Sequence, residues 1–310
     1  MKEDQESTLF FSVVIPTYNR LVQVQQSINS VLAQSYKRIE ILVVDDGSTD
    51  GSYEKLQELY IDAPSVRLIR QENKERAAAR NNGLKHAKGD YVQFLDSDDT
   101  LFPDHFQVLN SKIHGLNYPD FICTKYELFR EGKSISSSMS KISEGEYDYK
   151  MFLSGNPLAC NICVKRNNPA LHPFVEDRKY SIKEDWMFML QNLRNNKLYI
   201  VDTVTIRMDD HDQRSMRSDN RIIIEKTFLA EKWILENIEL SKSEKQILRA
   251  HVNYFCSIHS YIDGSKKTGT QYILKAIKEQ GLKSKYVVLL LKTVVGKKQI
   301  DRLKNFFSVK

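Results

Sequence analysis

The 310-residue sequence predicts an α/β fold in which helices cover both faces of a mostly parallel sheet. Two observations support this fold class. Short apolar runs typical of buried strands alternate with helical spacing of apolar residues through the first hundred residues. The composition, 41% hydrophobic and 28% charged, is that of a globular chain with a core of its own.

The strand and helix patterns follow one another in a regular order. Residues 11–15 form the first strand pattern, which we expect Pro16 to end, and apolar residues from Leu21 to Leu32 recur at helical spacing. Further strands are predicted at 39–44, 66–69 and 91–95, with helices at 53–60 and 76–87. The alternation predicts parallel strands joined by helices.

Beyond residue 120 the pattern is less regular. We expect a strand at 121–129, a serine-rich mobile connection at 131–143, a helix at 183–193 and an extended segment at 198–208. Helical patterns dominate after Asp219, so a domain boundary is predicted near residue 218.

Charge and cysteine content restrict the function only weakly. The net charge of +6 fits anionic partners such as nucleotide phosphates or lipid headgroups, and fits a merely solvated surface equally well. Cys160 and Cys163 form a lone C-x-x-C without two further ligands nearby in sequence, which favours reduced cysteines in a cytosolic protein over zinc. We see neither a secretion signal nor a run of about 20 apolar residues, so a cytoplasmic location is expected.

Polar clusters follow three of the predicted strands, at residues 16–19, 45–48 and 96–99. Parallel sheets bind ligands at the carboxyl ends of their strands, so these clusters predict one site at one edge. Asp96 and Asp98 have D-x-D spacing, which suits Mg²⁺ or Mn²⁺ together with substrate phosphates. The alternative is that Asp98, Asp99 or Thr100 caps a helix beginning near residue 103.

The second cluster, residues 45–50, also has two interpretations. It is either a turn with a helix cap or a carboxylate site for a base or ribose. Neither G-x-G-x-x-G nor G-x-x-x-x-G-K-[ST] occurs in the chain, which disfavours dinucleotide dehydrogenases and P-loop nucleotide hydrolases.

Three sequence blocks resemble those of family 2 glycosyltransferases of the bacterial cell-surface polysaccharide type. They are FSVVIPTYNR at 11–20, VVDDGSTD at 43–50 and ARNNGLKHAKGDYVQFLDSDD at 79–99, in the family's order. The resemblance is clear over residues 10–105 and weaker to about 218. It implies a GT-A catalytic domain at 1–218, with a donor half at 10–105 and an acceptor half at 106–218, followed by a helical C-terminal region at 219–310.

The resemblance also implies an activity. The expected reaction moves a hexosyl or N-acetylhexosaminyl group, with inversion and by single displacement, from a nucleotide-diphospho-sugar to an acceptor hydroxyl. UDP is the expected nucleotide, Mn²⁺ or Mg²⁺ the expected cofactor, and a glycan or lipid-linked glycan the expected acceptor. The resemblance assigns donor binding to six residues: Pro16, Tyr18, Asp45, Asp46, Arg80 and Asp96.

Other roles follow from weaker matches. Asp98 would bind the metal directly with His211 completing the site, and Asp185 of the Glu184–Asp185 pair would be the general base. Asp185 could instead be an acid favoured at a helix N-terminus, Arg80 an ion-pair residue and His211 a solvated loop residue. One departure from the family is that Glu75 stands where an Asn-x-Gly motif would have glycine, which puts the local loop geometry in doubt.

The C-terminal segment, residues 282–310, interleaves lysines with apolar residues. It would make peripheral contact with the inner face of the cell membrane, or else pack on the protein with a solvated basic face. Rival functions are a nucleotide-sugar-binding protein without catalysis, a nucleic-acid-binding protein and a sugar nucleotidyltransferase. Asp96, Asp98 and Asp185 argue against a protein that only binds the donor, and the acidic ligand edge argues against nucleic acid. A sugar nucleotidyltransferase should have a glycine-rich N-terminal loop, but residues 11–20 contain no glycine.

Overall fold

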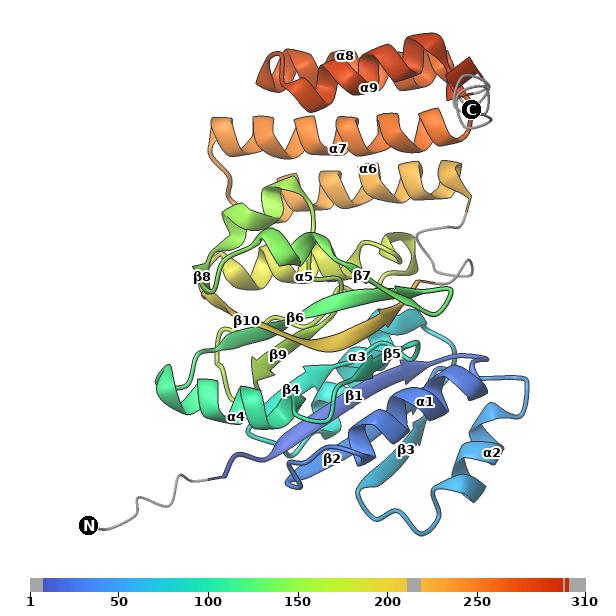
Figure 1. Cartoon of the computed structure of the whole chain (residues 1–310), viewed down its shortest axis with the longest axis vertical. Coiled ribbons are helices and arrows are strands. Elements are labelled where there is room, and N and C mark those ends of the chain that lie inside the picture. The colour runs from blue at the N-terminus through green and yellow to red at the C-terminus, as the bar shows by residue number, and fades with distance from the viewer. Residues whose placement is uncertain (1–7, 211–218, 298, 301–310) are drawn as a thin grey trace. The chain divides into compact units, whose positions relative to one another are not determined.

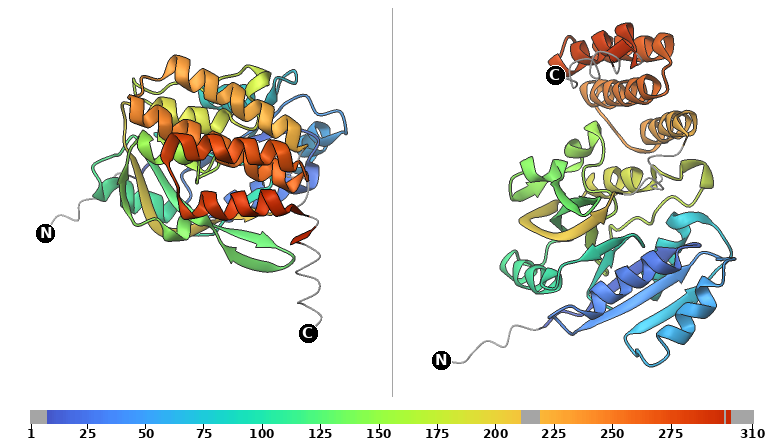
Figure 2. Two further views of the ribbon diagram at one scale, coloured as in Figure 1. Left: turned by 90° about the horizontal axis from the view of Figure 1, so that it is seen from above. Right: turned by 45° about the vertical axis from the view of Figure 1, so that its right-hand side comes forward.

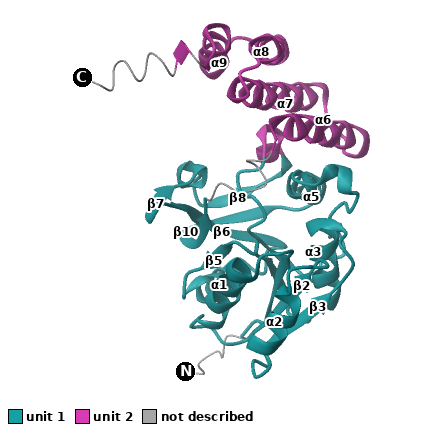
Figure 3. Cartoon of the chain, turned by 90° about the vertical axis from the view of Figure 1, so that its right-hand side faces the viewer, with its two compact units in different colours: residues 1–149, 156–211 teal, residues 150–155, 212–310 magenta. Residues whose placement is uncertain are grey.

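The computed structural model describes residues 8–210, 219–297 and 299–300. The chain divides into two compact units, residues 1–149 with 156–211 and residues 150–155 with 212–310 (Figure 3). The boundary predicted near residue 218 lies outside the described residues.

The first half of unit 1 is a regular alternation of strands and helices (Figure 1). Its strands pair in parallel in the order β3-β2-β1-β4. Right-handed crossovers therefore place α1 and α2 on one face and α3 on the other. The elements are β1 (Phe11–Thr17), α1 (Leu21–Leu32), β2 (Ile39–Asp45), α2 (Ser52–Leu59), β3 (Val66–Arg70), α3 (Glu75–His86) and β4 (Tyr91–Phe94).

The central strand β1 is buried along its whole length, and its side chains alternate between the two helical layers. Val13 belongs to the core cluster that contains Val24 and Ile28 of α1. Val14 faces α3, where a Cβ on Gly83 would lie 2.3 Å from its side chain. Gly83 therefore permits α3 to lie close to the sheet.

Pro16 lies within β1 and does not end it, contrary to the prediction. Thr17 is still in register with Asp45, and its carbonyl accepts a 2.9 Å hydrogen bond from the Asp46 amide. Proline removes only its own N–H, so the neighbouring residues can continue the pairing.

The second half of unit 1 extends the sheet in the order β4-β9-β6-β10-β5. Strand β9 runs antiparallel to β4 and β6, β10 runs parallel to β6, and β5 runs antiparallel to β10. The elements are β5 (Asp99–Leu101), α4 (His105–Gly115), β6 (Phe121–Arg130), β7 (Lys133–Ser136), β8 (Gly145–Tyr147), β9 (Ile162–Lys165), α5 (Glu184–Leu193) and β10 (Leu198–Asp209), with short 3₁₀ turns at Ser138–Lys141 and Arg178–Tyr180. A further 3₁₀ turn, Tyr149–Ser154, belongs mostly to unit 2. The predicted mixed, mostly parallel sheet flanked by helices is confirmed.

The serine-rich segment is ordered, so its prediction as a mobile connection is wrong. Strand β7 pairs antiparallel with β6, and a 3₁₀ turn follows. The Ser137 hydroxyl donates a 2.6 Å hydrogen bond to the Tyr126 carbonyl, and Met139 is buried. All four residues of β7 are exposed, so the strand lacks the apolar pattern that would have predicted it.

Unit 2 consists mainly of helices, as expected. Helix α7 packs against α6, α8 and α9, and α8 packs against α9 (Figure 2). The helices are α6 (Asn220–Asn237), α7 (Lys242–Ile262), α8 (Lys266–Gln280) and α9 (Ser284–Val295). Ser241 and Glu244 form a capping box that fixes the start of α7. In the described part of the chain, no helix combines the length and apolarity that crossing a bilayer requires.

Candidate active site

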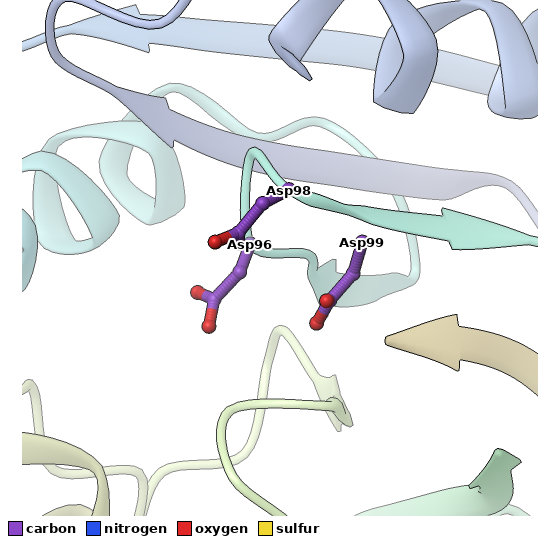
Figure 4. Close-up of side chains that lie close together, drawn as sticks. All are labelled: Asp96, Asp98 and Asp99. Carbon is purple, nitrogen blue, oxygen red and sulfur yellow. The ribbon is translucent and has the colours of Figure 1, made fainter. Parts of the chain in front are cut away.

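An acidic turn joins β4 to β5 and holds Asp96, Asp98 and Asp99 (Figure 4). One carboxylate oxygen from each of the three lies within 4.8 Å of the others. Helix α1 fixes the turn, because the Ser27 hydroxyl donates a 2.7 Å hydrogen bond to the Asp99 carbonyl. The D-x-D pattern thus becomes a group of three carboxylates.

The alternative interpretation of these aspartates as a helix cap is wrong. Residues Asp99–Leu101 form β5, and α4 begins only at His105, with Asp104 as its N-cap residue. Residues 99–101 are extended because they pair with β10, which is distant in sequence. The local sequence could not indicate this pairing.

Two arginines balance the charge of the acidic turn. Nη1 of Arg20 lies 2.8 Å from Asp98, and Nη2 of Arg80 lies 2.7 Å from Asp96. Carboxylate oxygens are the ligands that Mg²⁺ and Mn²⁺ prefer, so the three aspartates fit a divalent cation. Arg20 was not predicted as a site residue, although it ends the first sequence block.

Arg80 links the acidic turn to the start of α5. Its side chain is 2% exposed, and Nη1 donates a 3.0 Å hydrogen bond to Glu184 while Nη2 pairs with Asp96. The ring of Phe174 lies 5.3 Å from the guanidinium carbon. The ion-pair interpretation of Arg80 is therefore the one that the contacts support.

Asp185 follows Glu184 in the first turn of α5. Its Oδ1 accepts a 2.7 Å hydrogen bond from the Trp186 amide, and its Oδ2 accepts one of 3.1 Å from the Asn156 side chain. Burial, and then the negative charge of Glu184, raises the pKa of Asp185 to about 6 against the opposing charge of Arg80. A carboxylate with this pKa can accept a proton near neutral pH.

Asn156 is held by its own loop, so its bond to Asp185 has a fixed direction. Its Nδ2 also donates to the Ala159 carbonyl at 2.8 Å, and its Oδ1 accepts from the Leu158 amide at 3.0 Å. The backbone on the other side of the base is unusual, because Ile182 has a φ of +76°, which β-branched residues rarely adopt. No motif pointed to Asn156.

The loops after β1 and β2 are tied together. The Asn19 amide donates to the Ser48 hydroxyl at 2.9 Å, and the Thr49 amide donates to the Asn19 side chain at 2.8 Å. Pro16 is buried in β1, whereas Tyr18 is 43% exposed at the same edge. An exposed aromatic ring beside this hydrogen-bonded loop is suited to stacking on a planar ligand.

Asp45 and Asp46 have different environments at this edge. Asp46 Oδ1 accepts from the Lys74 amide at 2.9 Å and from the Gln71 side chain at 2.7 Å, which holds the loop before α3. Asp45 Oδ1 accepts from the Ser48 amide at 3.0 Å. Its buried Oδ2 has no hydrogen-bond partner within the described residues, and Thr17 Oγ1, in register with Asp45, has none either.

Glu75 begins α3 with a φ of +72°. This left-handed conformation is the one that glycine adopts most readily. The loop therefore keeps the backbone shape of a glycine at this position although the residue is glutamate.

The structure brings most of the expected residues to one edge of the sheet. Strands β2, β1 and β4 are adjacent and parallel, so the residues at their carboxyl ends lie along the same edge. Arg80 connects Asp96 there to Glu184 and hence to Asp185. His211, the predicted further metal ligand, lies outside the described residues. All four cysteines are free and buried.

Comparisons with known proteins agree with this geometry. The sequence profile of glycosyl transferase family 2 matches residues 12–166. An uncharacterized glycosyltransferase of Haemophilus influenzae is 34% identical over 202 residues, covering 61% of this chain and 74% of the relative. The Escherichia coli UDP-Glc:alpha-D-GlcNAc-diphosphoundecaprenol beta-1,3-glucosyltransferase WfgD is 30% identical, with 60% and 71% covered.

Other matches are partial or more distant. A Rickettsia felis glycosyltransferase is 40% identical over 43% of this chain, which spans only 22% of that relative's length. The crystal structure of S. aureus TarS 1-349 in complex with UDP-GlcNAc has a TM-score of 0.66 at 23% identity, covering 91% of this chain and 84% of TarS, and supports the fold. From the matched blocks, the fold and these relatives together, the chain belongs to glycosyl transferase family 2.

Proposed function

We propose that this protein is a metal-dependent, inverting glycosyltransferase that moves a sugar from a nucleotide-diphospho-sugar to an acceptor hydroxyl. One observation carries the proposal: Arg80 joins the acidic turn to the helix that bears Asp185. The acidic turn, which suits a cation and its diphosphate, is thus connected to Asp185, which suits the acceptance of a proton.

The proposed donor is a UDP-sugar, with a hexosyl or N-acetylhexosaminyl group. The name of WfgD specifies UDP-Glc, and TarS was crystallised with UDP-GlcNAc. In this chain, Tyr18 offers a ring on which a base can stack, and Asp45 Oδ2 is a buried acceptor suited to a base N–H. We assign Asp46 and Pro16 to the same donor site, where Asp46 holds the loop before α3 through the Lys74 amide.

Asp98 would hold a Mn²⁺ or Mg²⁺ ion together with Asp96 and Asp99, and we propose His211 as a further ligand. When bound, the cation supplies positive charge that offsets the negative charge growing on the departing diphosphate. Arg20 and Arg80 keep the aspartates oriented toward one another through their ion pairs.

Asp185 would act as the general base in a single displacement. The acceptor hydroxyl loses its proton to Asp185 as its oxygen forms a bond to the anomeric carbon. The bond from that carbon to the diphosphate oxygen breaks on the opposite face, and the diphosphate leaves with the electron pair. Attack opposite the leaving group inverts the configuration, and Asn156 keeps the base carboxylate in position.

The proposed acceptor is a glycan or a lipid-linked glycan of the cell envelope. The name of WfgD specifies an acceptor sugar on diphosphoundecaprenol, the diphosphate of a long-chain prenol. The protein would then work in the cytoplasm, peripherally at the inner face of the membrane through residues 282–310. Residues 298 and 301–310 of that segment lie outside the described part.

The decisive experiment measures Mn²⁺-dependent transfer and hydrolysis over a panel of nucleotide-sugars with Asp185→Asn. Loss of the base should lower turnover by about 10²–10⁴-fold while donor binding persists. Asp62→Asn, an exposed aspartate after α2, is the matched control. Near-normal turnover in Asp185→Asn would reject the assignment, and donor binding without turnover in the wild type would favour a binding protein.

A further inference from the structure

Helix α9 has an apolar strip that lies exposed in the described part of the chain. Val288, Leu291 and Val294 are 51%, 61% and 59% exposed, and Val287 and Val295 are also exposed. Spacings of three and four residues place these side chains on one side of the helix. The opposite side is buried, with Tyr286 and Leu289 in a core cluster that includes Ile273 of α8.

Lysines are frequent in the sequence around this strip, and two of them border it. From residue 266 to residue 297 the chain has one acidic residue, Glu279, and eight lysines: Lys266, Lys267, Lys275, Lys278, Lys283, Lys285, Lys292 and Lys297. Lys285 and Lys292 are exposed and seven residues apart on α9, so both border the strip on the same side. Partial burial and the charge of Lys283 hold the pKa of Lys285 below its usual value, as expected for crowded positive charge.

We propose that the outer face of α9 binds an anionic lipid surface, with the valines and Leu291 entering the headgroup region and the lysines contacting lipid phosphates. This inference extends the proposed function by naming the partner that would bring the enzyme to a lipid-linked acceptor. At about 1.5 Å per residue, the twelve residues of α9 are too short to cross a bilayer, so the helix lies along the surface.

The charge of this face favours an anionic lipid surface over a second copy of the chain. A second copy docking through the same face would bring two lysine-rich surfaces together, which like charges oppose. Anionic phosphates complement the lysines, and the apolar strip gains by leaving water. A vesicle containing phosphatidylglycerol satisfies both features at once.

The test is sedimentation of the full chain with phosphatidylcholine vesicles, with and without phosphatidylglycerol. Binding is expected only with phosphatidylglycerol and should weaken as salt rises. Val288→Gln with Leu291→Gln, and separately Lys285→Gln with Lys292→Gln, should each weaken binding on the order of tenfold. All four positions are exposed, so folding should be retained.

Two control variants test whether vesicle binding depends on the face of α9 or on any exposed apolar side chain or lysine. Ile61→Gln removes an apolar side chain that is 79% exposed in unit 1, and Lys232→Gln removes an exposed lysine of α6. Both should bind vesicles like the wild type. Equal binding by all variants, or wild-type dimers that Leu291→Gln dissociates, would overturn the proposal.

Nucleotide-sugar hydrolysis measured on the same samples distinguishes the two proposals. Intact hydrolysis without vesicle binding rejects only the lipid surface. Vesicle binding without hydrolysis under any donor rejects only the catalytic proposal.

Discussion

Asp96 and Glu184 share one guanidinium: Arg80 pairs with Asp96 at 2.7 Å and with Glu184 at 3.0 Å. The first acid follows β4, and the second begins α5 directly before the proposed base. Removing either acid leaves the buried Arg80 with one carboxylate partner instead of two. The shared guanidinium therefore couples the acidic turn to the start of α5, where Asp185 lies.

Glu184→Gln should shift the acid limb of the kcat/KM profile to lower pH. Wild-type activity should fall as pH drops through about 6, where Asp185 becomes protonated. Burial raises the pKa of Asp185 most, the charge of Glu184 raises it further, and the charge of Arg80 lowers it. A neutral residue 184 removes one of the two raising causes, so the pKa of Asp185 should fall. Glu58→Gln, at an exposed position on α2, should leave the profile unchanged. An acid limb that stays in place in Glu184→Gln would disprove this coupling.

Asn156→Ala should shift the same limb in the opposite direction, by about one to two pH units. The Asn156 side chain donates to Asp185 Oδ2, which favours the charged carboxylate, and such bonds contribute about 1.5–3 kcal/mol. Asn156→Ser should recover part of the shift, and Asn237→Ala on α6 should cause none. A fall in kcat at every pH without a shift would indicate a merely structural role for Asn156.

Asp98→Ala should weaken Mn²⁺-dependent UDP binding by at least about tenfold. The variant removes one of three clustered carboxylates and leaves Arg20 without its 2.8 Å partner. Titration calorimetry of UDP with and without Mn²⁺ measures the effect. Asp104→Ala, at an exposed position just before α4, is the control, and an identical titration for both variants would exclude the metal role.

Glu75→Gly should stabilise the fold by about 1 kcal/mol, because glycine adopts the φ of +72° without strain. The ion pair with Arg178, at 3.6 Å and largely exposed, should offset little of this. Gly51→Ala is the converse substitution, since its φ is +82° and no atom lies within 4 Å of an added Cβ, so it should destabilise. Urea denaturation of both variants measures the free energies, and effects of the same sign would contradict the argument.

Sequence patterns predicted those parts of the fold that depend on local chemistry. Buried runs and strand-end aspartates located β1, β2 and β4 because strand burial and loop polarity alternate along the chain. The pairing of Arg80 with Glu184 and the bond from Asn156 to Asp185 join distant segments, and no spacing rule encodes them. Strand β5 was missed for the same reason, since its three residues are extended only because β10 pairs with them.

The pairing of β5 with β10 also decides how short an active fragment can be. Asp99 of the acidic turn is in register with Met208, close to the end of β10. A fragment trimmed to the part that matches the family profile, ending at residue 166, would lack both Asp185 and the strand on which the acidic turn rests. Expression trials should therefore keep the chain through Asp209 at least.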